Sequence, residues 1–191
     1  MGFKFHSGVM AVGLRGPSPT IDAIASAWTD RPVTIVICPE IANTDNLGSL
    51  IRIASAFGAD GMVLGQRCCD PFYRQSIRVS MGTIFRVPLV RSNRVLDDMR
   101  SLRERYGVQL IAAVLAGNAE SLASASRPPR IGILFGNEAQ GLRPEEITAC
   151  DRRITIPMGL GTDSLNVSVS AGIFLYHFTQ LQGQQSMPND K

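Results

Sequence analysis

Apolar residues occur along this chain in short β-branched runs that alternate with longer stretches in which they recur every three or four positions. Residues 33–38 (VTIVIC) form such a run, and Pro39 follows it, which predicts a buried strand with a sharp end. From Asn46 to residue 57 the apolar positions fall on one side of a helix, and Gly58 predicts where that helix stops. The first part of the chain is therefore predicted to fold as a strand followed by a helix.

The same alternation continues toward the C-terminus. Further strands are predicted at residues 61–64, 87–90, 109–114, 131–135 and 153–156, and further helices at residues 76–83, 94–106, 144–148 and 165–180. Residues 121–129, rich in Ser, Ala and Pro, are predicted to form a surface connection. Strands separated by helices predict a parallel sheet with helices on both faces, which is an α/β fold.

The length and composition fit one domain. A chain of 191 residues with 45% apolar content can bury a single good core. Residues 1–30 do not follow the alternation and are expected to be a leader, residues 31–182 the folded domain, and residues 183–191 a flexible polar tail. The chain has no run of eighteen apolar residues and no apolar signal-peptide region, so we expect a cytoplasmic protein without a membrane partner.

The cysteines and the charges narrow the chemistry only slightly. Cys38, Cys68, Cys69 and Cys150 show neither paired CxxC spacing nor His partners, so we expect free thiols and no metal or disulfide framework. The net charge of +3 is too small to indicate nucleic-acid binding by itself. Of the 19 basic residues, 17 are Arg. This bias suits an RNA surface, because guanidinium groups match phosphates and stack on bases, but a GC-rich genome produces it equally well.

Three segments far apart in the chain each join a predicted strand to a turn rich in Gly and Asn. They are residues 43–52 (NTDNLGSLIR), 135–141 (FGNEAQG) and 156–168 (IPMGLGTDSLNVS). Because the carboxyl ends of parallel strands meet at one edge of a sheet, such segments bring backbone amides and polar side chains together. The pattern predicts a site for a small polar ligand.

In this order and at these spacings, the three segments resemble the motifs of the SpoU/TrmH-type RNA ribose 2′-O-methyltransferases of the SPOUT superfamily. The resemblance covers about residues 30–180. It implies a deep trefoil knot at the C-terminal end, S-adenosylmethionine as cofactor, tRNA or rRNA as substrate, and a homodimer with the site near its interface. Metal is not needed for this reaction, because the sulfonium is already a strong electrophile. One departure is Thr44-Asp45, which replaces the family's Pro-x before Asn46.

The resemblance assigns catalysis to Arg52, Asn46, Glu138, Ser164 and Asn166. Arg52 lies one turn after Gly48, where we expect the small residue to leave space for RNA. Free Arg has a pKa above ~12, so orientation and electrostatic support are the preferred role, with proton acceptance left open. Glu138 is expected to hold Arg52 or Asn46 in place. Asn46 and Ser164 stand where helix caps are expected and can combine capping with function.

The resemblance also implies which residues contact the cofactor. Gly136, Ile156 and Leu165 are the expected contacts, with Leu165 packing against the adenosine. Ala113 or Val114, at the end of the predicted strand, and Gly161, in the Gly-rich stretch of the third segment, are further candidates. A single glycine of this kind is usually part of an ordinary turn. The register of all of them with the family motifs is what points to a cofactor site.

Two other regions carry weaker signals. Residues 5–11 (FHSGVMA) resemble the stretch through which family members with an N-terminal RNA-recognition domain enter the catalytic domain; the alternative is a leader that adds an edge strand. His6 within it is expected to be structural. Arg74 and Arg78 are candidates for guiding RNA, or else solvated helix charges.

Two other classes of protein fit the sequence less well. A dehydrogenase-like nucleotide-binding enzyme needs Gly-x-Gly-x-x-Gly, whereas the stretch at Gly159 and Gly161 lacks the third glycine. A catalytically silent RNA-binding paralogue is expected to lose Arg52, Glu138 or Asn166, and all three are present. The sequence does not distinguish tRNA from rRNA.

Overall fold

The computed structural model describes residues 13–160 and 164–181. The predicted motif at residues 5–11 with His6, the candidate Gly161 and the predicted tail at 183–191 lie outside these ranges. Within them the chain forms a seven-stranded sheet in the order β3-β2-β1-β6-β4-β7-β5. All of its strand pairs are parallel, as predicted. The strands are β1 (Val33–Cys38), β2 (Gly61–Leu64), β3 (Leu89–Arg91), β4 (Gln109–Ala113), β5 (Glu120–Ser121), β6 (Arg130–Leu134) and β7 (Arg152–Thr155).

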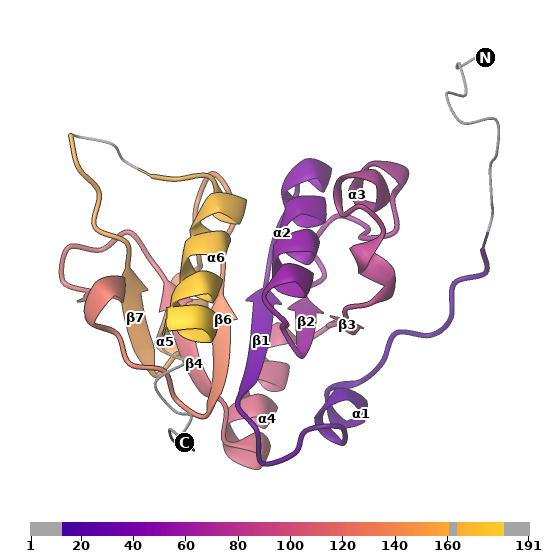
Figure 1. The fold of residues 1–191 in the computed structure, drawn as a ribbon, viewed down its shortest axis with the longest axis horizontal. Coiled ribbons are helices and arrows are strands. Elements are labelled where there is room, and N and C mark those ends of the chain that lie inside the picture. The colour runs from indigo at the N-terminus through magenta and orange to yellow at the C-terminus, as the bar shows by residue number, and fades with distance from the viewer. Residues whose placement is uncertain (1–12, 161–163, 182–191) are drawn as a thin grey trace, which may run out of the picture.

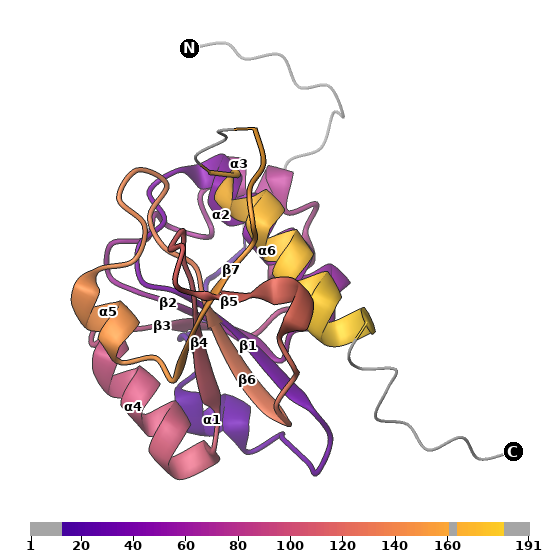
Figure 2. The same ribbon diagram turned by 90° about the vertical axis from the view of Figure 1, so that its left-hand side faces the viewer.

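Helices cover both faces of the sheet, as Figures 1 and 2 show. One face carries α1 (Ile21–Ala25), α4 (Val95–Tyr106) and α5 (Pro144–Thr148), and the other carries α2 (Thr44–Ala56), α3 (Arg74–Val79) and α6 (Val167–Tyr176). Successive strand residues point to opposite faces, so the strands supply two separate cores. On β1, for example, Val36 packs toward α2 and α6, whereas Ile35 packs toward α1 and α4. The α/β fold expected from the alternating pattern is confirmed.

Several element boundaries match the sequence prediction. The predicted ranges of β1, β2 and α5 are those observed, and α4 ends directly before Gly107, whose φ of 64° terminates the helix. Gly58 likewise follows the end of α2 with a φ of 67°. A positive φ is a conformation that glycine adopts without steric cost, so these stops could be read from the sequence.

Other boundaries differ from the prediction. The helix predicted at 76–83 is instead α3, which ends at Val79, and a 3₁₀ turn at Thr83–Phe85 follows it. Residues 121–129 do not form a plain surface connection, because β5 and the 3₁₀ turn Leu122–Ser124 add an edge to the sheet and Leu122 is buried. The short helix α1 was not predicted.

The last helix is shorter than predicted. It begins at Val167 and changes at residue 177 into a turn of π-helix, His177–Leu181. None of the helices in the described ranges is long and apolar enough to cross a membrane.

Close packing of α2 on α3 gives a test of this fold. A Cβ added at Gly48 would lie 2.8 Å from both the carbonyl oxygen of Ser76 and the Cβ of Val79. We expect Gly48→Ala to lower the free energy of unfolding by about 1–3 kcal/mol in urea titrations, although alanine is the better helix former. Gly172→Ala in α6 is the matched control, because its nearest atom, Ile53 Cδ1, is 4.0 Å away. Equal effects of the two substitutions would contradict this packing.

Candidate functional site

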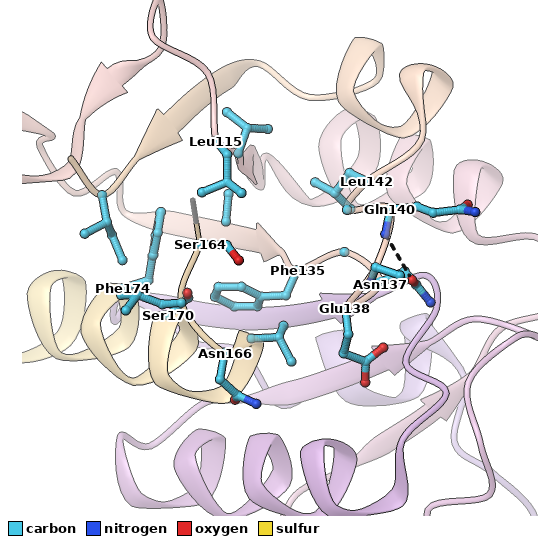
Figure 3. A pocket seen from close by; sticks show the side chains of 18 of the residues that line it. Leu115, Phe135, Asn137, Glu138, Gln140, Leu142, Ser164, Asn166, Ser170 and Phe174 are labelled. Atoms are coloured by element: carbon cyan, nitrogen blue, oxygen red, sulfur yellow. Dashed lines mark hydrogen bonds between the residues drawn. The ribbon is translucent and has the colours of Figure 1, made fainter. Parts of the chain in front are cut away.

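A pocket of about 600 Å³ lies where the chain leaves the carboxyl ends of β4, β6 and β7 (Figure 3). Its walls come from four segments: residues 113–116 after β4, 135–142 after β6, 156–158 after β7, and the start of α6. Asn46 of α2 also lines it. This volume and this position at the edge of a parallel sheet are typical of a small-molecule site.

The pocket combines an apolar floor with a polar rim. Phe135 lies at its centre and meets Phe174 of α6 edge to face, with ring centroids 5.7 Å apart (Figure 3). Leu115, largely exposed, and Ile156 belong to the lining. Ser164 points its hydroxyl toward the same space (Figure 3). Such a lining suits a ligand with one flat apolar part and several polar groups.

A tight turn after β6 forms one wall. Its ends are joined by two backbone hydrogen bonds, from Asn137 N to Gly141 O at 3.0 Å and from Gly141 N to Asn137 O at 2.8 Å. Inside the turn, Asn137 Oδ1 accepts from the amides of Ala139 and Gln140 (Figure 3). A Cβ on Gly136 would lie 2.2 Å from the carbonyl carbon of Gly141. The turn therefore requires glycine at position 136.

A chain of side-chain hydrogen bonds connects the three sequence motifs. Asn46 Nδ2 donates to Glu138 Oε1 at 3.0 Å, and Asn166 Nδ2 donates to Asn46 Oδ1 at 2.9 Å. Asn166 Oδ1 in turn accepts from the amide of Ser168 at 2.9 Å. The structure thus brings Asn46, Glu138 and Asn166 together at the mouth of the pocket, and Figure 3 shows Glu138 and Asn166 turned toward α2.

The predicted helix caps are wrong in both places. Helix α2 begins two residues before Asn46, because Asn43 caps it by accepting from the amides of Asp45 and Asn46. Helix α6 is capped by Asn166 and not by Ser164, which lines the pocket instead. Because Asn43 does the capping, the side chain of Asn46 is available for Glu138 and Asn166.

Arg52 is the one predicted catalytic residue within the described ranges that does not line the pocket. It is exposed, and it lies about 120° around the helix from Asn46, six residues earlier. Glu138 bonds to Asn46 and not to Arg52. The expectation that Gly48 leaves room for RNA is also wrong, because α3 fills the space above it.

The predicted cofactor contacts within the described ranges, unlike Arg52, lie in the pocket lining. Gly136, Ile156, Leu165 and Val114 all line the pocket, and they come from four separate segments. The lining also includes Leu115, Met158 and Gln140, which sequence reasoning did not single out. Gln140 lay inside a quoted motif, whereas nothing in the sequence marked Leu115 beyond its place after a strand.

None of the four cysteines lines the pocket. All four cysteines are free, and Cys68 donates from Sγ to the carbonyl oxygen of Cys38 at 3.1 Å. Burial raises the pKa of Cys68 to about 11 and that of Cys150 to about 12, so both thiols are protonated at neutral pH. Among the residues that the structure describes, no three His, Cys, Asp or Glu side chains are grouped to hold a metal ion.

The sequence is similar to those of known proteins. The model of the SpoU rRNA Methylase family matches residues 33–176. An uncharacterized tRNA/rRNA methyltransferase of Mycobacterium bovis is 35% identical over 184 residues, which cover 94% of this chain and 62% of that protein. The chain therefore spans less than two thirds of the length of this relative.

Solved structures share the fold. The SpoU methyltransferase AviRb from Streptomyces viridochromogenes, in complex with the cofactor AdoMet, matches with a TM-score of 0.76 at 27% identity, over 88% of this chain and 66% of that one. The structure of an RNA 2′-O ribose methyltransferase matches with a TM-score of 0.71 at 28% identity, over 88% and 62% of the two chains. The parallel-sheet α/β fold of this chain is thus the fold of SpoU methyltransferases.

Proposed function

The chain belongs to the SpoU rRNA Methylase family, and on that premise we propose that it transfers a methyl group from S-adenosylmethionine to a ribose 2′-hydroxyl of tRNA or rRNA. The observation that carries this proposal is the meeting of the three motifs at one pocket through Asn46, Glu138 and Asn166. Support for the cofactor comes from AviRb, solved with AdoMet. Support for the ribose hydroxyl comes from the 2′-O ribose methyltransferase of the same fold.

The lining of the pocket fits this cofactor. Ile156, Leu165 and Leu115 offer apolar surface for the adenosine, and the turn that begins at Gly136 offers backbone groups for its polar atoms. Ser164 and Gln140 add polar side chains along the same lining. When bound, the cofactor supplies an electrophilic methyl group.

The chain's own residues would orient the acceptor and handle its proton. The Asn46 amide is fixed at both ends, by Glu138 and by Asn166, so its position at the pocket mouth is defined before any ligand binds. A ribose hydroxyl that arrives there meets donors and acceptors held in one geometry. Arg52, exposed on α2, supplies positive charge for the phosphate or ribose, and its action as the proton acceptor is the alternative role.

The architecture that we propose includes the trefoil knot and the predicted domain limits. After β7, near one edge of the sheet, the chain returns to the middle of the sheet, where α6 packs on α2 (Figure 1). A knotted C-terminal segment requires such a return and also the passage of the chain through a loop. In this proposal residues 31–182 are the methyltransferase domain, with α1 of the preceding residues packed on it, and the protein acts on tRNA or rRNA in the cytoplasm.

We further propose a homodimer through α2 and α6. These helices lie side by side (Figure 1), and Phe57 of α2 meets Tyr176 with ring centroids 6.2 Å apart. The outer side of α6 presents Val169, Ile173 and Tyr176, which are 50%, 39% and 49% exposed. Their spacing of four and three residues makes one apolar stripe, which a partner subunit would cover.

Other classes of function remain distinguishable by experiment. A catalytically silent RNA-binding paralogue would bind RNA without transferring a methyl group. A different nucleotide-binding α/β enzyme would bind its nucleotide without needing Arg52 or Asn166.

The central prediction is that the protein binds S-adenosylmethionine and methylates ribose. Calorimetry should show binding that a metal chelator does not change, because the pocket is built from backbone, polar and apolar groups. Incubation with tRNA and rRNA from a strain lacking the gene should yield 2′-O-methylnucleosides, measured by mass spectrometry after nuclease digestion. Binding lost on chelation, or methyl groups found only on bases, would contradict the proposal.

A second prediction separates chemistry from cofactor binding. Arg52 lies outside the pocket lining, so Arg52→Ala should abolish methyl transfer yet leave the cofactor Kd within about threefold of wild type. Arg100→Ala is the matched control, because Arg100 is exposed on α4, on the opposite face of the sheet, and this variant should retain methyl transfer. A large loss of cofactor affinity in Arg52→Ala would show that Arg52 contributes to cofactor binding and would contradict its proposed role at the RNA.

The third prediction concerns assembly. Burial of the apolar stripe on α6 should stabilise a dimer by about 25 cal/mol per Å² before the cost of association. Light scattering at micromolar concentration should give twice the chain mass, and Ile173→Glu should shift it toward monomer. The exposed Ala123→Glu, on the 3₁₀ turn after β5, is the control that should leave the dimer intact. A stable and active wild-type monomer would rule out the interface.

A further inference from the structure

A cluster of charged side chains lies beside the pocket but contributes nothing to its lining. Glu40 follows β1, Arg67 follows β2, and Arg143 and Glu146 lie at the start of α5. Arg67 Nε is 2.8 Å from Glu40 Oε2, and Arg67 Nη2 is 3.5 Å from Glu146 Oε1. Arg143 Nη2 is 3.9 Å from the same oxygen of Glu40. The cluster ties together three loops that are distant in sequence.

The second carboxylate oxygen of Glu40 reaches the turn that forms one wall of the pocket. Glu40 Oε1 accepts from Asn137 Nδ2 at 3.2 Å, across 97 residues of sequence. The other end of the Asn137 amide, Oδ1, accepts from the backbone amides of Ala139 and Gln140. The Asn137 side chain is therefore fixed at both ends, by its own turn and by Glu40.

Partial burial strengthens the ion pair between Glu40 and Arg67. The side chains of Glu40 and Arg67 are only 30% and 34% exposed, so their ion pair is less screened than one in open solvent. Glu146 is 4% exposed, and burial raises the pKa of its carboxyl. Its Oε2 accepts from the backbone amide of Arg143 at 2.8 Å, which fixes the start of α5 beside the cluster.

We propose that Glu40 is a positioning residue for the cofactor: through Asn137 it holds the turn at residues 137–141 in the orientation that the pocket needs, and Arg67 and Arg143 hold Glu40. The proposal rests on the proposed function, because it concerns cofactor binding in the same pocket. Glu40 does not line the pocket. Its effect reaches the site through the turn, whose other side bonds through Glu138 to Asn46.

Three substitutions test the role of Glu40. Glu40→Gln keeps the size of the side chain and removes its charge, so its amide cannot serve both Asn137 and Arg67 as an acceptor. Glu145→Gln is the matched control, because Glu145 pairs with the same Arg143 at 3.7 Å but is 51% exposed. Arg67→Met is a second variant, which removes a partner of Glu40 and leaves Asn137 in place.

Cofactor binding is the first measurement. In Glu40→Gln we expect the calorimetric Kd and the KM for S-adenosylmethionine to rise about tenfold, the effect of losing one hydrogen bond to a charged group. We expect kcat at saturating cofactor within about twofold of wild type. Arg67→Met should raise Kd about threefold and Glu145→Gln should not change it. A purely structural role would instead lower kcat with KM unchanged, and an unchanged Kd in Glu40→Gln would overturn the proposal.

Hydrogen exchange without cofactor is the second measurement. The amides of Gln140 and Gly141 are bonded within the turn, so Glu40→Gln should speed their exchange about tenfold while the amides of β6 keep their protection. This readout holds even if wild-type protein binds no S-adenosylmethionine, an outcome that would defeat the proposed function alone. Unchanged exchange in the turn would overturn the positioning role of Glu40, and Arg67→Met gives the same comparison if Glu40→Gln does not fold.

Discussion

The pairing of β6 with two neighbours is the constraint on which the rest of the site depends. β6 pairs with β1 on one side and with β4 on the other, so it joins the two halves of the sheet. The next residue, Phe135, still donates its amide to Ile37 of β1 at 2.9 Å. The turn after β6 therefore starts from a fixed point, with the loop of β1 on one flank and that of β4 on the other. If β6 paired at an edge, the three motifs would not meet.

The polar contacts at this edge define geometry more than they add stability. A hydrogen bond between two neutral side chains such as the amides of Asn166 and Asn46 contributes only about 0.5–1.5 kcal/mol net, because water replaces it in the unfolded chain. Two fully buried cores hold the sheet and its helices together. The hydrogen bonds instead select one orientation of each amide. This is the property that a site for in-line transfer requires.

Local features of the structure could be predicted, whereas partners across the fold could not. The limits of β1 follow from a β-branched run and Pro39, and the stop of α4 follows from Gly107. Asn43 and Asn46 are the same residue type three positions apart, so only the path of the backbone decides which of them caps α2. Glu40 gave no signal at all, because its partner Asn137 is 97 residues away. The family resemblance pointed to several residues that line the pocket, such as Gly136 and Leu165, yet it could not show that Arg52 does not line the pocket of its own chain.

In the proposed function, Arg52 lies on a helix that takes part in both the chemistry and the dimer interface. Helix α2 carries Asn46 at the pocket and Arg52 on another side of the helix. One helix therefore contributes both to the pocket lining and to the exposed surface that bears Arg52. Helix α6 does the same, because Asn166 caps its start at the pocket while Val169 and Ile173 remain exposed along its length. The two helices pack against each other, so any partner that covers the apolar stripe also approaches the helix that bears Arg52. In the proposed dimer the site and the interface are therefore built from the same two helices, and a change that loosens one would loosen the other.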